Sequence, residues 1–157
     1  LDLLINNAST LGTLPMPTLI VYDLEALNNV FQINVIAPVA LVQSLLPYLE
    51  NGLVINLSSD AAVGGYAGWG GYGASKAALD LISATLANEL ESIAIVSVDP
   101  GDMRTDMHQN AFPSEDISDR PLPEATLPFW GWLLGQDRQA INGKRYQAQE
   151  ELWEVTS

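Results

Sequence analysis

Cysteine is absent from this chain of 157 residues, and histidine occurs once, as His108. Without cysteine the chain forms no disulfide bond and has no thiolate to act as a nucleophile or metal ligand. A single histidine also excludes a metal site built from several imidazole groups. We therefore expect a protein that works without a bound metal ion.

Basic residues are scarce as well: six lysines and arginines stand against nineteen aspartates and glutamates, which gives a net charge of −13. This charge repels phosphate backbones and anionic lipids, so neither a nucleic acid nor a membrane surface is an expected partner. No uninterrupted apolar run is long enough to span a membrane, and no basic segment followed by an apolar one opens the chain. We expect a soluble protein of the cytoplasm.

The residues that are present favour one globular domain over residues 1–157, because 48% of them are hydrophobic and 16% are charged. Short apolar runs at residues 3–5, 53–57 and 93–98 are typical of strands buried on both faces of a sheet. Such strands, separated by helical patterns and short loops, predict an α/β fold. We expect a Rossmann-like, doubly wound parallel sheet with helices on both faces.

Two long helical patterns separate these strands. The first runs over residues 24–49 after a capping Asp23. Pro38 should kink it, because proline lacks the N–H that would otherwise bond the carbonyl of Asn34. The second helix is predicted over residues 72–89.

The remaining segments are less regular. Residues 60–71 are rich in glycine but lack the spacing and position of a phosphate-binding loop, which indicates a flexible connection. Residues 102–128 hold four prolines and many acidic residues and show no periodicity, which is typical of either a mobile loop over a substrate site or a disordered segment. A short helix over residues 127–134 and an edge strand over residues 144–148 are predicted to follow.

Tyr72 and Lys76 stand one helical turn apart, so both side chains project from the same face of the second helix. A phenol has a pKa of about 10 in water, and a fixed ammonium group nearby lowers it. Such a tyrosine can serve as a general acid or base near neutral pH. The spacing often arises by chance, but this chain contains only two lysines, so Lys76 is not one of many solvating charges.

Several motifs, found in one order along the chain, resemble those of the short-chain dehydrogenase/reductase family. They are Asn6-Asn7-Ala8-Ser9 after the first strand, Asn34 in the first helix, Ile55 to Ser59 at the end of the second strand, Tyr72-x-x-x-Lys76, and Asp99-Pro100-Gly101 through Thr105. The resemblance extends from Leu1 to about Asp106. Ser9 stands where the family has glycine, and the family's glycine-rich turn for the cofactor pyrophosphate has no counterpart here. We expect a chain truncated at its N-terminal half, or a shortened relative.

The resemblance implies hydride transfer between NAD or NADP and a small-molecule carbonyl or alcohol substrate. It implies that Tyr72 is the acid/base, that Lys76 lowers its pKa and contacts the cofactor ribose, and that Ser59 holds the substrate oxygen. Ser59 is preferred to Ser58 because the family's serine usually lies thirteen residues before the tyrosine. Asn34 would hold a water molecule next to Lys76. The implied cofactor contacts are Asn7, Ala8, Tyr72, Lys76, Pro100, Gly101 and Thr105.

Two other functions stay open at this point: a non-catalytic or truncated nucleotide-binding relative, and a sugar-nucleotide epimerase or dehydratase of the extended type, which shares the Tyr-x-x-x-Lys motif. An intact protein of this kind is expected to be a homo-oligomer. For residues 1–157 alone we expect weak NAD(P) binding, no turnover, and association through an exposed sheet edge.

Further residues near the motifs are expected to play no part in chemistry. His108 is expected at the surface, and Asp102, Arg104 and Asp106 are expected to be solvated loop charges. Ser58 is expected to be a buried hydroxyl at a strand end. The four tryptophans are expected to serve packing, while Met103 and Met107 either line a pocket or belong to the core.

Overall fold

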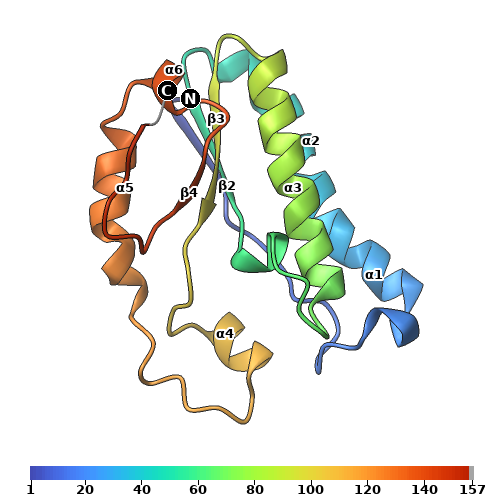
Figure 1. Cartoon of the computed structure of the whole chain (residues 1–157). Coiled ribbons are helices and arrows are strands. Elements are labelled where there is room, and N and C mark those ends of the chain that lie inside the picture. The colour runs from blue at the N-terminus through green and yellow to red at the C-terminus, as the bar shows by residue number, and fades with distance from the viewer. Residues whose placement is uncertain (156–157) are drawn as a thin grey trace.

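Four parallel strands lie at the centre of the protein, flanked by helices on both faces, in a computed structural model that describes residues 1–155 (Figure 1). The strands pair in the order in which they follow each other along the chain, and each pair is parallel. They are β1 (Leu3–Asn6), β2 (Leu53–Leu57), β3 (Ala94–Asp99) and β4 (Arg145–Gln147). The predicted α/β class is confirmed, as are the four predicted strands.

The two central strands, β2 and β3, are buried along their whole length, as their unbroken apolar runs predict. The strand β1 lies at an edge of the sheet, and the side chain of Ile5 on it is 48% exposed. Within residues 1–155 the outer edge of β1 has no partner strand, and apolar side chains lie beside its backbone groups.

Side chains that alternate along the strands reach two separate clusters. Val54 and Ile95 pack with Val42 and Ala87, which belong to α2 (Ala37–Leu45) and α3 (Gly70–Glu89). The opposite face of the sheet packs on α5 (Leu127–Leu134) and α6 (Arg138–Ile141). Buried residues of that cluster include Leu53, Ile55, Val96, Val98, Phe129, Leu133 and Ile141. Figure 1 shows α2 and α3 on one side of the strands and α5 on the other.

The first predicted helix is divided into two. Helix α1 (Leu24–Phe31) begins after Asp23, whose Oδ2 accepts a hydrogen bond from the Ala26 N–H at 2.8 Å, as predicted for a cap. A π-helical turn, Gln32–Ile36, joins α1 to α2, and Pro38 stands in the first turn of α2. The wider π turn accommodates the missing N–H of the proline, so the predicted distortion lies just before Pro38.

The segment from Leu24 to Tyr48 is long and apolar enough to cross a membrane by length and composition alone, which the sequence analysis did not predict. In the structure, Val42, Leu45 and Leu46 from this segment pack on the sheet. Its outer face carries exposed apolar side chains, including Leu24 and Ile36.

The expectation of an irregular chain over residues 102–128 is wrong in its first part, where the structure has helix α4 (Asp106–Ala111). Thr105 caps this helix, and its Oγ1 accepts a hydrogen bond from the His108 N–H at 3.2 Å. A threonine followed by an acidic residue is a common helix start, so this signal was present in the sequence. The glycine-rich segment 60–71 likewise begins with a 3₁₀ turn, Asp60–Ala62.

Helix α3 approaches that 3₁₀ turn so closely that only glycine fits at position 73. A Cβ on Gly73 would lie 2.6 Å from the carbonyl oxygen of Ala61. We expect Gly73→Ala to lower the free energy of unfolding by about 1–3 kcal/mol, measured by urea denaturation, because backbone must move to relieve the clash. Gly131→Ala in α5 is the matched control: no atom of the described residues that could clash lies within 4 Å of a Cβ built there, and a stabilisation of about 0.5–1 kcal/mol is expected. Equal effects of the two changes would contradict the clash.

Candidate active site

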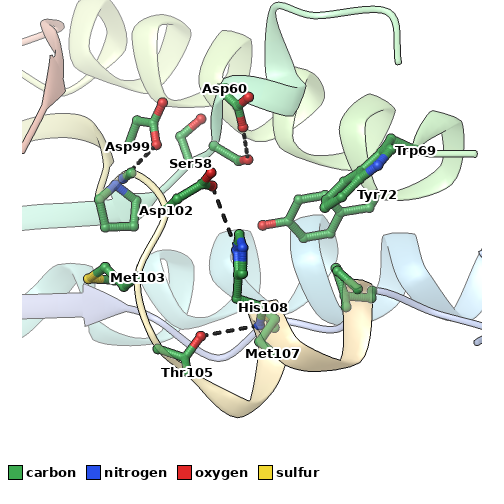
Figure 2. Close-up of a pocket in the computed structure, with 15 residues that line it drawn as sticks. Ser58, Asp60, Trp69, Tyr72, Asp99, Asp102, Met103, Thr105, Met107 and His108 are labelled. Atoms are coloured by element: carbon green, nitrogen blue, oxygen red, sulfur yellow. Dashed lines mark hydrogen bonds and ion pairs between the residues drawn. The ribbon is translucent and has the colours of Figure 1, made fainter. Parts of the chain in front are cut away.

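A cavity of about 130 Å³ opens at the carboxyl ends of β2 and β3 (Figure 2). Its walls come from the residues that follow these two strands, from the first turn of α3 and from α4. Carboxyl ends of neighbouring parallel strands meet at one edge of a sheet, which is where open α/β sheets bind their ligands. The fold thus gathers segments that lie far apart in the sequence.

Ser59 and Tyr72, which the sequence analysis placed in one site, both line this cavity. The Ser59 Oγ donates to Asp60 Oδ1 at 3.0 Å and accepts from the Ala61 N–H at 3.2 Å, so the start of the 3₁₀ turn fixes its position. Tyr72 lies in the first turn of α3 and is 7% exposed. A serine and a tyrosine hydroxyl therefore face the same small space.

The Tyr72 phenol is harder to ionise than a free one. Burial raises its pKa to about 12, the nearby Ser59 and Ser9 hydroxyls lower it, and the charges of Asp99 and Asp60 raise it further. The expectation that the Tyr72 pKa is lowered is wrong for this structure, because the cost of burying a phenolate exceeds the favourable contacts.

Lys76 lies behind the cavity rather than in it. Its side chain is 2% exposed, and its Nζ donates to the carbonyl oxygen of Leu57 at 2.7 Å and lies 5.6 Å from the centre of the Tyr72 ring. Burial lowers the Lys76 pKa to about 8, while the charge of Asp80 raises it. The difference between the Lys76 pKa and neutral pH is therefore much smaller than for an exposed lysine.

Asn34 lies in the π turn and joins the loop after β1 to α3. Its Oδ1 accepts from the Thr10 N–H at 2.9 Å and the Ser9 hydroxyl at 3.1 Å. Its Nδ2 donates to the Thr10 carbonyl and to the Ser75 hydroxyl, each at 2.9 Å. The side chain thus has a clear structural function, and its role beside a water molecule stays a prediction.

The residues expected to contact the cofactor fall into three places. Pro100, Gly101 and Thr105 line the cavity together with Tyr72. Lys76 lies behind the cavity, and the exposed Asn7 and Ala8 follow β1 at the open edge of the sheet. Gly101 has a φ of +75°, a conformation that side chains other than glycine rarely adopt. The structure therefore places Pro100, Gly101 and Thr105 beside Ser59 and Tyr72.

An ionic network around Arg145 was not foreseen. From β4, its Nε donates to Asp80 at 3.0 Å, and its terminal nitrogen donates to the Ser59 carbonyl at 2.9 Å and to Asp99 at 3.3 Å. The Ser58 hydroxyl, buried as expected, donates to the same Asp80 oxygen at 2.7 Å. The sequence gives only a weak signal for this network. Arg145 and its acidic partners lie far apart in the chain and become neighbours only through the order of the strands in the sheet.

His108 and Trp69 are also part of the cavity wall. The side chain of His108 is 10% exposed, so the expectation of a surface histidine is wrong. Helix α4, missing from the sequence prediction, turns this side chain inward. Asp102 and Arg104 are exposed, as expected, although Asp102 borders the cavity. Met103 and Met107 line the cavity.

The other three tryptophans follow the packing prediction. Trp130, Trp132 and Trp153 pack against Phe129, with ring centres 5.0–5.9 Å from it. Phe129 is fully buried in the cluster beneath α5. These rings therefore belong to the core on the face opposite α3.

Comparison with known proteins supports the same reading of the motifs. A family described as short chain dehydrogenase matches residues 1–116. The oxidoreductase YciK of Escherichia coli strain K12 is 34% identical over 154 residues, covering 95% of this chain and 60% of YciK. Mouse (Mus musculus) sepiapterin reductase is 40% identical over 114 residues, covering 69% of this chain and 44% of that protein.

A solved structure gives the corresponding likeness in three dimensions. The short chain dehydrogenase of Shigella flexneri 2a complexed with NADP superposes with a TM-score of 0.88 at 34% identity, covering 96% of this chain and 64% of that one. The chain thus spans less than two thirds of the length of these relatives. The matched segment contains every motif of the cavity, and the chain belongs to the short-chain dehydrogenase family of oxidoreductases.

Proposed function

We propose that the whole protein is an NAD(P)-dependent reductase of small carbonyl compounds, with Tyr72 as its acid/base. The observation that carries this proposal is the shared cavity of Ser59 and Tyr72 at the carboxyl ends of the strands. A carbonyl oxygen placed there meets two hydroxyl donors at once. Family membership supplies the reaction type, since the relatives are oxidoreductases.

Each residue has a distinct task in this proposal. The Ser59 hydroxyl, which donates to Asp60 in the structure, turns its proton to the substrate oxygen when substrate binds and holds that oxygen beside the phenol. The Tyr72 hydroxyl donates a proton to that oxygen during reduction and regains it in the reverse direction. A phenol whose pKa is about 12 is protonated at neutral pH and therefore carries the proton that this step needs.

The cavity also fits a nicotinamide cofactor by the chemistry of its walls. When bound, the cofactor supplies the hydride for the carbonyl carbon. Gly101 brings the backbone to the cavity wall without a side chain, and Pro100 and Thr105 lie next to it. These three would hold the nicotinamide, while Lys76, with two ammonium N–H groups beyond its bond to Leu57, would hold the ribose. Asn7 and Ala8 would contact the cofactor at the sheet edge.

The test is a pair of measurements on the whole protein. We expect micromolar binding of NADPH or NADH by calorimetry, and loss of reduced nicotinamide absorbance when a panel of small aldehydes and ketones is added. Absence of cofactor binding would refute the proposal. Binding without turnover of any carbonyl compound would instead favour a non-catalytic nucleotide-binding relative.

A further inference from the structure

The cavity beside Tyr72 has an acidic wall. Asp60, Asp99 and Asp102 line it, and within the described residues 1–155 its lining contains no lysine or arginine. An anionic substrate group would meet three carboxylates, and water screens part of the Coulomb repulsion because Asp60 and Asp102 are exposed. The wall therefore selects against anions.

Neighbouring arginines reduce this negative charge without cancelling it. Arg145 is shared between Asp99 and Asp80, at 3.3 and 3.0 Å. Arg120 is likewise shared between Asp102 at 3.9 Å and Asp119 at 2.7 Å. Asp60 accepts a hydrogen bond from the neutral Ser59 hydroxyl and interacts with the Tyr66 hydroxyl. Two guanidinium groups thus face five carboxylates, which leaves the region around the cavity negative.

Aromatic rings complete the same wall. Trp69 lies 5.6 Å from Phe112 and 5.9 Å from Tyr72, measured between ring centres. A second hollow of about 280 Å³ shares Asp60, Trp69 and Asp102 with the first, and Phe112 also lines it. Faces of tryptophan and phenylalanine attract cations through their quadrupoles, most strongly where water is excluded. Rings and carboxylates together form the kind of surface that binds a positively charged nitrogen.

An unpaired ring nitrogen in the cavity wall gives an independent indication of a ligand. His108 is 10% exposed, and its Nδ1 lies 3.7 Å from the Asp102 carboxylate, while its Nε2 is buried and has no hydrogen-bond partner among residues 1–155. In the tautomer that carries its proton on Nδ1, the nitrogen nearer Asp102, Nε2 is an acceptor. Figure 2 shows the His108 ring pointing into the pocket, between Asp102 and Tyr72. A bound N–H donor would satisfy this nitrogen.

We propose that the substrate is a carbonyl compound with a cationic nitrogen, an ammonium or guanidinium group, held between Asp60, Asp102 and Trp69. One N–H of this group is donated to the free Nε2 of His108, and the carbonyl end lies at Ser59 and Tyr72. This inference rests on the proposed reductase function for its carbonyl end, but the cation site depends only on the wall just described.

A matched series of ketones tests the charge preference. The whole protein with NADPH is assayed with 4-(aminomethyl)acetophenone, with the neutral 4-ethylacetophenone and with the anionic 4-acetylbenzoate. We expect kcat/KM to be about tenfold higher for the cation than for the neutral ketone, which corresponds to about 1.4 kcal/mol, and lowest for the anion. Equal values for the cation and the neutral ketone would overturn the inference while leaving the reductase function intact.

Variants of the cavity wall test whether its carboxylates cause the preference for the cationic ketone. Asp102→Asn should remove most of the advantage of the cation, measured as the ratio of kcat/KM for 4-(aminomethyl)acetophenone to kcat/KM for 4-ethylacetophenone, because only the charged substrate loses an attraction. Asp119→Asn is the matched control, since this aspartate pairs with the same Arg120 but does not line the cavity. A preference that survives both Asp102→Asn and Asp60→Asn would place the cation elsewhere and contradict the proposal.

A binding measurement separates this inference from the proposed reaction. Titration with benzyltrimethylammonium should quench part of the tryptophan fluorescence, and Trp69→Phe should abolish this quenching. Neutral benzyl alcohol should have little effect. Quenching without turnover of any ketone would support the cation site and refute the reductase. Similar responses to the charged and the neutral probe would refute the site.

Discussion

Phenylalanine in place of Tyr72 is expected to lower turnover by about 10²–10⁴-fold, the usual contribution of a positioned acid or base. The change removes one hydroxyl and keeps the ring, so the contact with Trp69 at 5.9 Å persists. Because the hydroxyl faces the cavity rather than a packed core, the free energy of unfolding should change by less than about 1 kcal/mol. The measurements are kcat for carbonyl reduction and chemical denaturation of the same preparations.

Tyr48→Phe is the matched control for that variant. Tyr48 is 67% exposed and ends the 3₁₀ turn Leu46–Tyr48 after α2, outside the cavity that Ser59 and Tyr72 line. Its loss of a hydroxyl should leave kcat nearly unchanged. A Tyr72→Phe enzyme with more than a tenth of the original kcat would show that another group supplies the proton.

Methionine in place of Lys76 is expected to stabilise the fold near neutral pH. Burial lowers the Lys76 pKa from its ordinary 10.5 to about 8, so keeping this buried lysine charged costs on the order of 3 kcal/mol. A methionine fills similar space without a charge. The hydrogen bond to the Leu57 carbonyl is lost, which offsets part of the gain. We expect a net rise of about 1–2 kcal/mol in the free energy of unfolding at pH 7, by urea denaturation.

The sign of the pH dependence follows from the same shift. Between pH 8 and 10.5 the unfolded chain keeps a proton on Lys76 that the folded chain has released, so the original protein gains stability as the pH rises through this window. Below pH 8 both states are protonated and the whole cost of burial remains. Tyr72 acts in the opposite direction above pH 10, because its folded pKa is about 12 and the folded state retains its proton longer. Lys76→Met should remove only the rise between pH 8 and 10.

The chain's other lysine provides the comparison. Lys144→Met should leave the rise between pH 8 and 10 in place. If Lys76→Met destabilises the protein at pH 7 and keeps the pH profile, the lysine is charged at little cost, and the low pKa is refuted. In the whole protein the same variant should also weaken cofactor binding, which calorimetry measures independently of stability.

The sheet could be predicted from the sequence because each central strand is marked by a local pattern, an unbroken apolar run. Each residue of β2 and β3 is buried, so the apolar runs at residues 53–57 and 93–98 needed no knowledge of the partners. The cap by Asp23 and the turn at Asn51, which has a φ of +60°, are equally local. Helix α4 was missed although its Thr105 cap is local, because the surrounding prolines suggested an irregular loop.

The sequence predicted which residues meet in the candidate site, but it did not predict the charges and pKa shifts there. The proximity of Ser59 and Tyr72 follows from motif order and parallel topology. The raised pKa of Tyr72 does not, since it depends on how much water the surrounding side chains remove. Arg145 could not be assigned either, because its partners Asp80 and Asp99 lie 65 and 46 residues away. Charges on different strands become neighbours only once the strand order is known.

The contacts of Arg145 also bear on the order in which the protein assembles during synthesis. Asp99, on the buried β3, and the partly buried Asp80 emerge from the ribosome before the strand that carries their cation. Until β4 docks, these carboxylates lack their arginine, and the Ser59 carbonyl lacks one of its donors. Burial of an unpaired carboxylate is costly, so we expect the serine side of the cavity to take its final shape only after residue 145 is in place. Docking of β4 is therefore the step that completes the serine side of the site.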